Sequence, residues 1–224
     1  MISKKNIHKI ATILPYKESY TVNNASAVSL WVSEFFKNSI YKNINYIYGN
    51  TKPGKYLTKN YRNIFLDSLK LRFQSTSNEY TEKLIYTLNQ EKFDIIEIHN
   101  RPLVLSKLMG KINSKFIMYY HNDPLSMSGS KTVSERNEII KKVDKLIFIS
   151  RWVKDRFFKG INNNFLHKTK IIYHSVNTRK KTIKSNLIVF VGKLNYSKGY
   201  DIYKDAIIKI LDKYENWKAL SIGS

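Results

Sequence analysis

Residues 187–224 read LIVFVGKLNYSKGYDIYKDAIIKILDKYENWKALSIGS. The stretch starts with an apolar run that ends at Gly192, continues through a short polar loop, and then shows the periodicity of an amphipathic helix. A second apolar run, 219–222, follows the helix. Strand, loop, helix and strand in this order predict two parallel strands joined by a helix, the repeating unit of α/β proteins.

The loop of this unit carries two lysines, Lys193 and Lys198. In open α/β sheets, phosphorylated ligands bind where the carboxyl end of a strand meets the N-terminus of the next helix, because free amide groups and the helix dipole favour an anion there. The spacing makes both lysines candidate phosphate ligands. It fits equally well with ordinary surface lysines in a βα loop.

The preceding residues repeat the same alternation of apolar runs and amphipathic stretches. Several runs are continuously apolar, which is typical of strands covered on both faces of a parallel sheet. The predicted strands are 7–14, 44–48, 95–98, 116–120, 146–149 and 171–173, and the predicted helices are 25–37, 79–90, 103–109, 135–142 and 152–158. The sequence therefore predicts an α/β fold with parallel sheets.

A polar, basic run at 178–185 is the best linker in the sequence. We therefore predict one complete domain over residues 1–180 and the beginning of a second over 181–224. We find no internal repeat and no low-complexity tract.

The composition describes a folded protein with a strong positive charge. The 224 residues include 39 Lys and Arg against 17 Asp and Glu, a formal net charge of +22. These cations are spread along the chain, so a solvated basic surface is the favoured interpretation. Contact with an anionic membrane is the second, and specific nucleic-acid binding is the third. There is no cysteine and no long apolar run of about 18 residues. A cytoplasmic location is the simplest expectation.

Polar residues gather directly after the predicted strands of the first domain. They are Tyr16 and Lys17 after the first strand, His99, Asn100 and Arg101 after the third, His121, Asn122 and Asp123 after the fourth, and Ser150 after the fifth. A single histidine is more often structural than functional, but two His-Asn pairs in equivalent places favour a site. We predict that these residues line a ligand cleft.

The final segment resembles the opening of the C-terminal domain in family 4 glycosyltransferases of the GT-B type. The resemblance rests on Gly192-Lys193-Leu194, Lys198-Gly199, the following helix, Trp217 and Ile222-Gly223. It implies two Rossmann-like domains, the second of which binds the donor. It also implies that Gly192, Lys193 and Lys198 hold the diphosphate of a nucleotide sugar. Lys193 stands where the family more often has Arg, which keeps the charge and loses the planar fork.

In the first domain the resemblance is looser. It implies that His121 lies beside the transferred sugar, where it would stabilise charge rather than act as a nucleophile. The loop 15–27 has no glycine where many relatives have a glycine-rich turn, so hydroxyls and amides of the loop are expected to meet the acceptor instead. His174 and Ser175 replace an Asn-Gly pair of the family.

The resemblance implies a retaining, metal-independent enzyme that moves a sugar from a nucleotide sugar to a glycan or lipid-linked acceptor, in cell-surface polysaccharide synthesis. No cofactor and no metal are expected, in agreement with the lack of an Asp-x-Asp pair. The family's Glu-x₇-Glu element would come after residue 224, so we expect an incomplete form. The alternative is a non-catalytic remnant or binding module that needs a separate donor-binding half.

A basic and aromatic stretch over residues 56–73 predicts a further helix. Tyr56, Tyr61, Phe65, Leu69 and Phe73 would form its apolar side. An ordinary packed helix is the favoured interpretation, and a peripheral contact with an anionic membrane is the alternative.

Overall fold

The computed structural model describes residues 9–162, 165–175 and 183–223. The chain divides into two compact units, Met1–Ser175 and Val176–Ser224, which are described separately. The predicted domain boundary near residue 180 and most of the predicted linker fall on residues 176–182, outside the described part. Within the described part, no helix is both long and apolar enough to span a bilayer.

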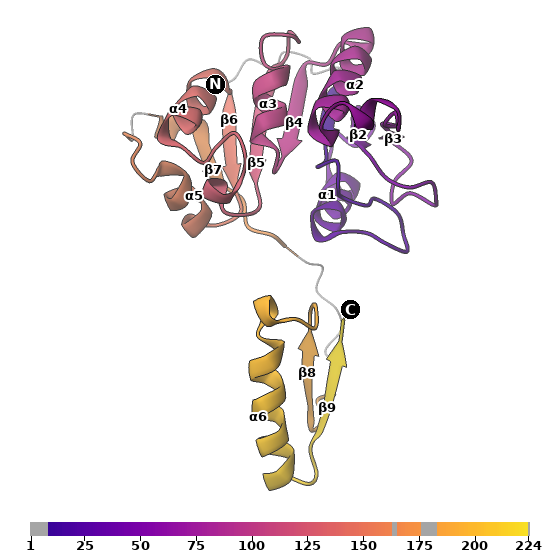
Figure 1. Ribbon diagram of the computed structural model, residues 1–224, viewed down its shortest axis with the longest axis vertical. Helices are drawn as coiled ribbons and strands as arrows, with labels where there is room; N and C mark the ends of the chain where they lie inside the picture. The colour runs from indigo at the N-terminus through magenta and orange to yellow at the C-terminus, as the bar shows by residue number, and fades with distance from the viewer. Residues whose placement is uncertain (1–8, 163–164, 176–182, 224) are drawn as a thin grey trace. The chain divides into compact units, whose positions relative to one another are not determined.

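The first unit is built on a parallel sheet of seven strands (Figure 1). The strand order is β3-β2-β1-β4-β5-β6-β7, and every pairing is parallel. The strands are β1 Ile10–Ile13, β2 Asn45–Gly49, β3 Tyr61–Asn63, β4 Ile95–His99, β5 Lys115–Tyr120, β6 Lys145–Phe148 and β7 Thr169–Ile171. The predicted α/β class is confirmed, and the order reverses direction between β1 and β4.

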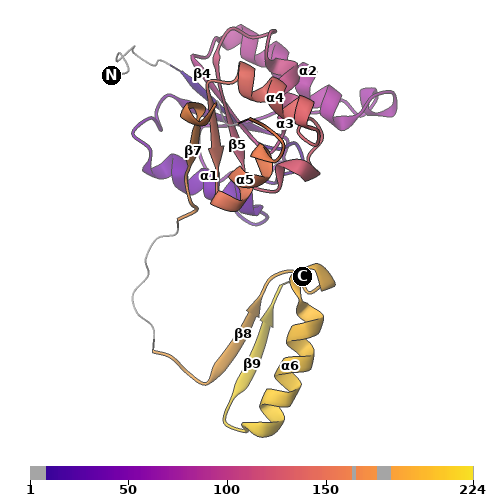
Figure 2. The ribbon, with the colours of Figure 1, turned by 90° about the vertical axis from the view of Figure 1, so that its left-hand side faces the viewer.

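Helices cover both faces of this sheet (Figure 2). The main core joins one sheet face to α2, α3, α4 and α5, while a smaller cluster joins the other face to α1. The helices are α1 Ala27–Asn38, α2 Thr76–Glu91, α3 Pro102–Leu108, α4 Val133–Lys142 and α5 Arg151–Phe158. All five lie within a few residues of the predicted ranges, because amphipathic periodicity marks their extent, and side-chain caps begin α2, α4 and α5.

One buried arginine, Arg136, links two segments near the C-terminal end of this unit. Helix α4 starts with a capping box between Thr132 and Glu135. In the same turn Arg136, only 2% exposed, donates to the carbonyls of Ser130 (3.2 Å), Lys131 (2.7 Å), Phe157 (2.7 Å) and Lys159 (2.6 Å). Its guanidinium thus fixes the loop before α4 to the end of α5.

The prediction of a helix over residues 56–73 is wrong. Tyr56 forms an antiparallel bridge with Thr21, residues 61–63 form the edge strand β3, and only Lys70–Arg72 makes a single 3₁₀ turn. Tyr61 is buried against Tyr20, with ring centroids 4.7 Å apart, so the stretch gains more by closing the sheet edge than by forming a helix. Phe73, 90% exposed, does not pack.

The second unit contains β8 Leu187–Val191, the 3₁₀ turn Tyr196–Lys198, α6 Tyr200–Lys213 and β9 Lys218–Ile222. The two strands pair in parallel, as predicted. Phe190 packs against Tyr200 and Tyr203 of α6, with both centroid distances at 5.1 Å. On the opposite face of the two strands, Leu187, Val189, Val191, Leu220 and Ile222 are exposed.

Candidate active site

The candidate site lies at the carboxyl edge of the seven-stranded sheet, around the point where the strand order reverses. Ligands of open α/β sheets bind at such a switch point, because the loops that follow the two central strands diverge there. The loop after β1 supplies Tyr16, and the turn after β4 supplies Arg101, whose guanidinium carbon lies 5.0 Å from the centre of the Tyr16 ring. Two of the predicted cleft residues are therefore in contact.

Two buried polar atoms near this contact each lack a hydrogen-bond partner in the described part of the chain. Within the described residues, Nε of Arg101 and Oε2 of Glu18 are buried without a hydrogen-bond partner, although Nη1 of Arg101 donates to the carbonyl of Asn100 (2.8 Å). Burial raises the pKa of Glu18, and the charge of Arg101 opposes this rise. Unused donors and acceptors at a switch point suit a polar ligand.

Three histidines form one hydrogen-bonded chain at this edge. His99 Nδ1 lies 2.8 Å from His121 Nε2, and His121 Nδ1 lies 3.0 Å from His174 Nε2. His99 is the last residue of β4, His121 follows the neighbouring strand β5, and His174 follows β7. His99 and His121 are buried (1% and 5% exposed) and His174 is exposed. The chain therefore runs from the interior to the surface, and His174 is its solvent end.

Burial lowers the pKa of all three imidazoles and so favours their neutral form. Burial lowers the pKa of His121 to about 3, with a smaller contribution from His174. Burial also lowers the pKa of His99 and of His174, and for His99 both neighbouring rings add to the effect. A neutral imidazole donates at one nitrogen and accepts at the other, so the chain has two tautomeric directions.

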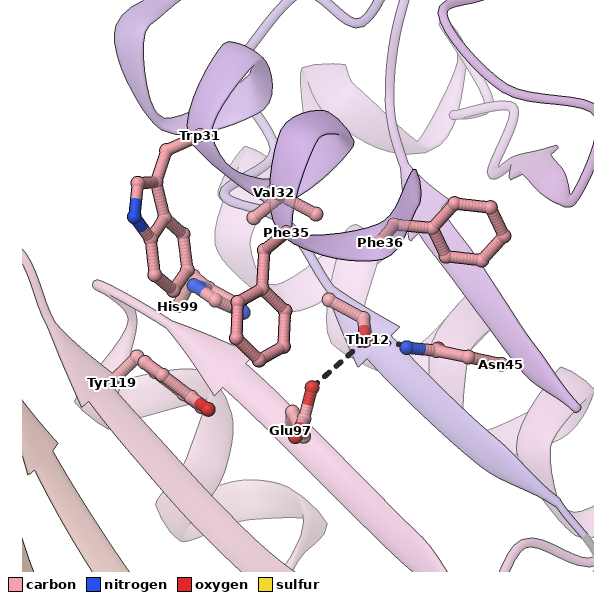
Figure 3. A pocket seen from close by; sticks show the side chains of 9 residues that line it. All are labelled: Thr12, Trp31, Val32, Phe35, Phe36, Asn45, Glu97, His99 and Tyr119. Carbon is pink, nitrogen blue, oxygen red and sulfur yellow. Dashed lines mark hydrogen bonds between the residues drawn. The ribbon is translucent and has the colours of Figure 1, made fainter. Parts of the chain in front are cut away.

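Aromatic rings hold the histidine chain in place. Trp31 of α1 contacts His99, His121 and His174, with centroid distances of 5.9, 5.0 and 5.2 Å. Tyr119 stacks on His99 at 4.6 Å. Helix α1 therefore does more than cover the sheet, since its Trp31 packs over the buried His99 (Figure 3) and contacts His121 and His174.

A carboxyl group lies beneath the histidines on the same sheet face. Glu97 precedes His99 by two residues on β4, so both side chains point toward α1. Thr12 Oγ1 lies 3.0 Å from both Glu97 Oε2 and Asn45 Oδ1 (Figure 3). Burial raises the pKa of Glu97 to about 7, and Thr12 opposes this rise. Since the Thr12 hydroxyl has one proton, a protonated Glu97 that donates to Thr12 satisfies all three groups.

The Glu97→Gln variant is expected to lose a pH dependence of stability. A carboxyl group whose folded pKa lies near 7 stabilises the fold when protonated, and this stabilisation is lost as pH rises from about 5 through 7. Relative to the variant, the wild-type free energy of unfolding should fall by about 2 kcal/mol between pH 5 and 8. Urea titrations at intervals of one pH unit measure it. His99 and Tyr119, which line the same space as Glu97, are present in both proteins, so the comparison isolates the carboxyl group. Parallel curves would contradict the assignment.

Two further predicted residues have positioning roles. Asn100 has φ +52°, an uncommon backbone conformation that Asn tolerates better than most residues. Its Oδ1 accepts from the backbone N–H of His121 (2.7 Å), and its own N–H donates to the carbonyl of Tyr119 (2.9 Å). Asn100 thus sets the turn that places His121. Ser150 caps α5 by accepting from the N–H of Val153 (3.2 Å).

Of the remaining predicted residues, one forms an ion pair and two are exposed. Asp123 forms an ion pair with Arg156 (2.8 Å), which holds the pKa of its carboxyl below the usual value. Asn122 and Lys17 are exposed. No group of three or more His, Asp or Glu in the described part of the chain is arranged to hold a metal ion.

In the second unit, Lys193 and Lys198 lie in the loop between β8 and α6, as predicted. Both side chains are exposed. Gly199, which directly precedes α6, has φ +70°, a left-handed conformation that glycine adopts at low cost. Gly192 follows the last residue of β8 and donates to the carbonyl of Ile222 (2.9 Å).

Four residues around the histidine chain were not among the site residues predicted from the sequence. They are His174, Trp31, Glu97 and Tyr119. The spacing of Glu97 and His99 places both on one face of a strand, a signal that was available. Nothing in the local sequence indicates that Trp31 covers this face. Nor does it show that the segment after β7 returns to β5.

The fold is that of GT-B glycosyltransferases, and solved structures of such enzymes resemble the chain. Anabaena Alr3699/HepE in complex with UDP-glucose has a TM-score of 0.63 at 13% identity, over 97% of this chain and 70% of that one. The lipopolysaccharide outer core galactosyltransferase WaaB has a TM-score of 0.62 at 16% identity, with 96% and 68% covered. Sucrose-phosphate synthase from Thermosynechococcus elongatus has a TM-score of 0.67 at 12% identity, with 96% and 62% covered.

The resemblance predicted from the sequence is thus confirmed at the level of the fold. No protein-family model and no curated protein matches the chain. The chain spans between 62% and 70% of the length of the three solved structures. At such low identity these structures establish the architecture, and the activity has to be argued from the residues of the site.

Proposed function

We propose that the protein takes part in transfer of a sugar from a nucleotide sugar to a hydroxyl group of an acceptor, with retention of anomeric configuration and without a metal ion or other cofactor. The observation that carries the proposal is the histidine chain at the switch point of a GT-B fold. Trp31, Tyr119 and Asn100 preorganise its imidazoles, and burial favours their neutral form. Such groups stabilise charge that develops on a sugar without reorganisation.

His121 is the residue proposed to contact the transferred sugar. In this structure His99 and His174 occupy both of its ring nitrogens. Because His174 is exposed, a sugar hydroxyl that takes its place at Nδ1 of His121 is the least costly arrangement. His99 would then fix the tautomer from behind, since its ring is buried and stacked on Tyr119.

Gly192, Lys193 and Lys198 are proposed to hold the diphosphate of the donor. The support is their placement after β8 and before the N-terminus of α6, where two ammonium groups and the helix dipole favour an anion.

Lys198→Ala is expected to weaken nucleotide-sugar binding about 10- to 100-fold, because it removes one charge-assisted hydrogen bond to phosphate. Lys209→Ala, which changes an exposed lysine on α6, is the matched control and should bind like wild type. Titration calorimetry with UDP-glucose and its nucleoside diphosphate measures both. Equal affinities of the two variants would remove Lys198 from the proposed site.

A glycan or lipid-linked acceptor in cell-surface polysaccharide synthesis is proposed on the first unit, with peripheral contact to an anionic membrane. The support for the membrane contact is the net charge of +22 together with the exposed Phe65, Leu69 and Phe73, next to Lys70 and Arg72. Sedimentation with vesicles of anionic lipid tests it, and equal sedimentation of a Phe65→Ser/Phe73→Ser variant would count against it.

The alternative is a non-catalytic binding module that needs a separate donor-binding half. It is favoured by the exposed apolar face of β8 and β9, which a larger domain would cover. Nucleoside diphosphate released from a nucleotide sugar by the purified protein distinguishes the two functions. Release supports the enzyme, and donor binding without release supports the module.

A further inference from the structure

A polar cavity lies beside the switch point, and Lys17 is the one predicted cleft residue that lines it. It has a volume of about 530 Å³, which is in the range of small-molecule sites. The loop after β1 and the loop after β2 form its walls. Since both loops start at carboxyl ends of strands, the cavity opens on the same sheet edge as the histidine chain.

All charged side chains that line the cavity are positive. Lys17, Lys52 and Lys55 line it, and no Asp or Glu does. Among the described residues, none of these three ammonium groups forms an ion pair. Three unpaired cations around one concave space raise the local concentration of anions.

The remaining lining groups are neutral hydrogen-bonding groups. Hydroxyls come from Ser19 and Thr21, whose oxygens lie 3.3 Å apart, and amides come from Asn23, Asn24 and Asn50. No aromatic side chain lines the cavity. Hydroxyls and amides in this number match a ligand with many hydroxyl groups, such as a sugar, and offer little to an apolar one.

Hydrogen bonds between the two loops form the cavity without a ligand. Thr21 is bridged to Tyr56, and the N–H of Val22 donates to the carbonyl of Lys55 (2.9 Å). The N–H of Tyr20 donates to Thr51 Oγ1 (2.9 Å). At Gly54 a Cβ atom would lie 3.2 Å from the Thr21 methyl group, so a larger residue would press on this wall. A preformed site costs little ordering on binding.

The cavity is also connected to the candidate active site. Asn50, one of its lining residues, donates through Nδ2 to the carbonyl of Tyr16 (3.3 Å). Tyr16 in turn contacts Arg101. A ligand seated in the cavity therefore lies next to the switch point, where an acceptor would present its reacting hydroxyl group.

We propose that this cavity binds an acidic sugar unit of the acceptor, one that carries a carboxylate or a phosphate group. The three lysines recognise the oxyanion, and the hydroxyls and amides recognise the sugar ring. The proposal rests on the proposed glycosyl transfer for its biological role, because it identifies the acceptor as an anionic glycan. The binding site itself is testable without turnover.

Chemical-shift mapping on the ¹⁵N-labelled full chain, at 0.15 M salt, tests the proposal. Glucuronate and glucose 6-phosphate are the probes for the two oxyanions, glucose is the neutral control, and inorganic phosphate is the charge-only control. We expect at least one acidic sugar to shift the amides of residues 21–24 and 51–55 and to bind at least tenfold more tightly than glucose and phosphate. The preferred probe identifies carboxylate or phosphate as the oxyanion.

A Lys52→Glu/Lys55→Glu variant should weaken this binding at least tenfold. Lys111→Glu should leave it unchanged, because Lys111 is exposed in the loop before β5, at the opposite edge of the sheet. Equal binding of glucose and the acidic sugars, tighter binding of phosphate alone, or shifts elsewhere in the spectrum would each overturn the proposal. Nucleotide-sugar binding is measured on the same samples. If the protein binds an acidic sugar but no nucleotide sugar, the proposed function is contradicted and the cavity assignment still holds.

Discussion

His121→Ala is expected to lower the turnover number of sugar transfer by about 100- to 1,000-fold, the usual effect of removing one preorganised polar group from a reacting centre. The variant interrupts the chain between His99 and His174 and leaves His99 Nδ1 without its partner. Donor affinity should change far less, because the proposed diphosphate ligands lie on the other unit. Initial rates across a range of donor concentrations separate the two quantities.

His167→Ala is the matched control, since His167 is exposed in a short turn before β7. It should turn over like wild type. A purely structural role of His121 would appear as a lower folded fraction with an unchanged rate per folded molecule. That result, or a rate within about threefold of wild type with a folded protein, would contradict the catalytic assignment.

Arg136→Met is expected to lower the free energy of unfolding of the first unit by about 3–5 kcal/mol, because buried groups are left without partners. The substitution keeps an unbranched apolar stem and removes all five donors. Four carbonyl groups that accept from Arg136 in a buried setting would lose their partner. The loop before α4 and the end of α5 would separate first.

Arg151→Met is the matched control, because Arg151 is exposed in the first turn of α5. It should change the free energy of unfolding by less than about 0.5 kcal/mol. Urea unfolding followed by circular dichroism measures both variants, and hydrogen exchange of residues 130–136 and 157–159 locates the effect. A loss below about 1 kcal/mol in Arg136→Met would show that water replaces the guanidinium at little cost.

Most of the fold follows from local patterns in the sequence. Helix starts such as Thr132 with Glu135, and Ser150 before α5, coincide with the beginning of apolar periodicity, so the predicted and observed ranges agree closely. The continuously apolar strands indicate a parallel sheet covered on both faces. By contrast, β3 is short, and its apolar content comes mainly from Tyr61, so a helical periodicity in the same residues misled the prediction.

The site was only partly predictable, because long-range geometry creates it. The position of His99 and His121 after neighbouring strands indicated a shared edge, and both are there. The contact of His121 with His174 depends on the path of the chain after β7, which no local pattern specifies. The burial that raises the pKa of Glu97 depends on α1 packing over β4, and amphipathic periodicity does not say which strand a helix covers.

The most direct test of the central claim is the release of nucleoside diphosphate from a panel of nucleotide sugars, measured with wild-type protein and with His121→Ala. We expect release by the wild type with at least one nucleotide sugar, unaffected by a metal chelator, and a loss of about 100-fold or more in the variant. Equal release by both proteins, or release that stops when the chelator is added, would contradict it.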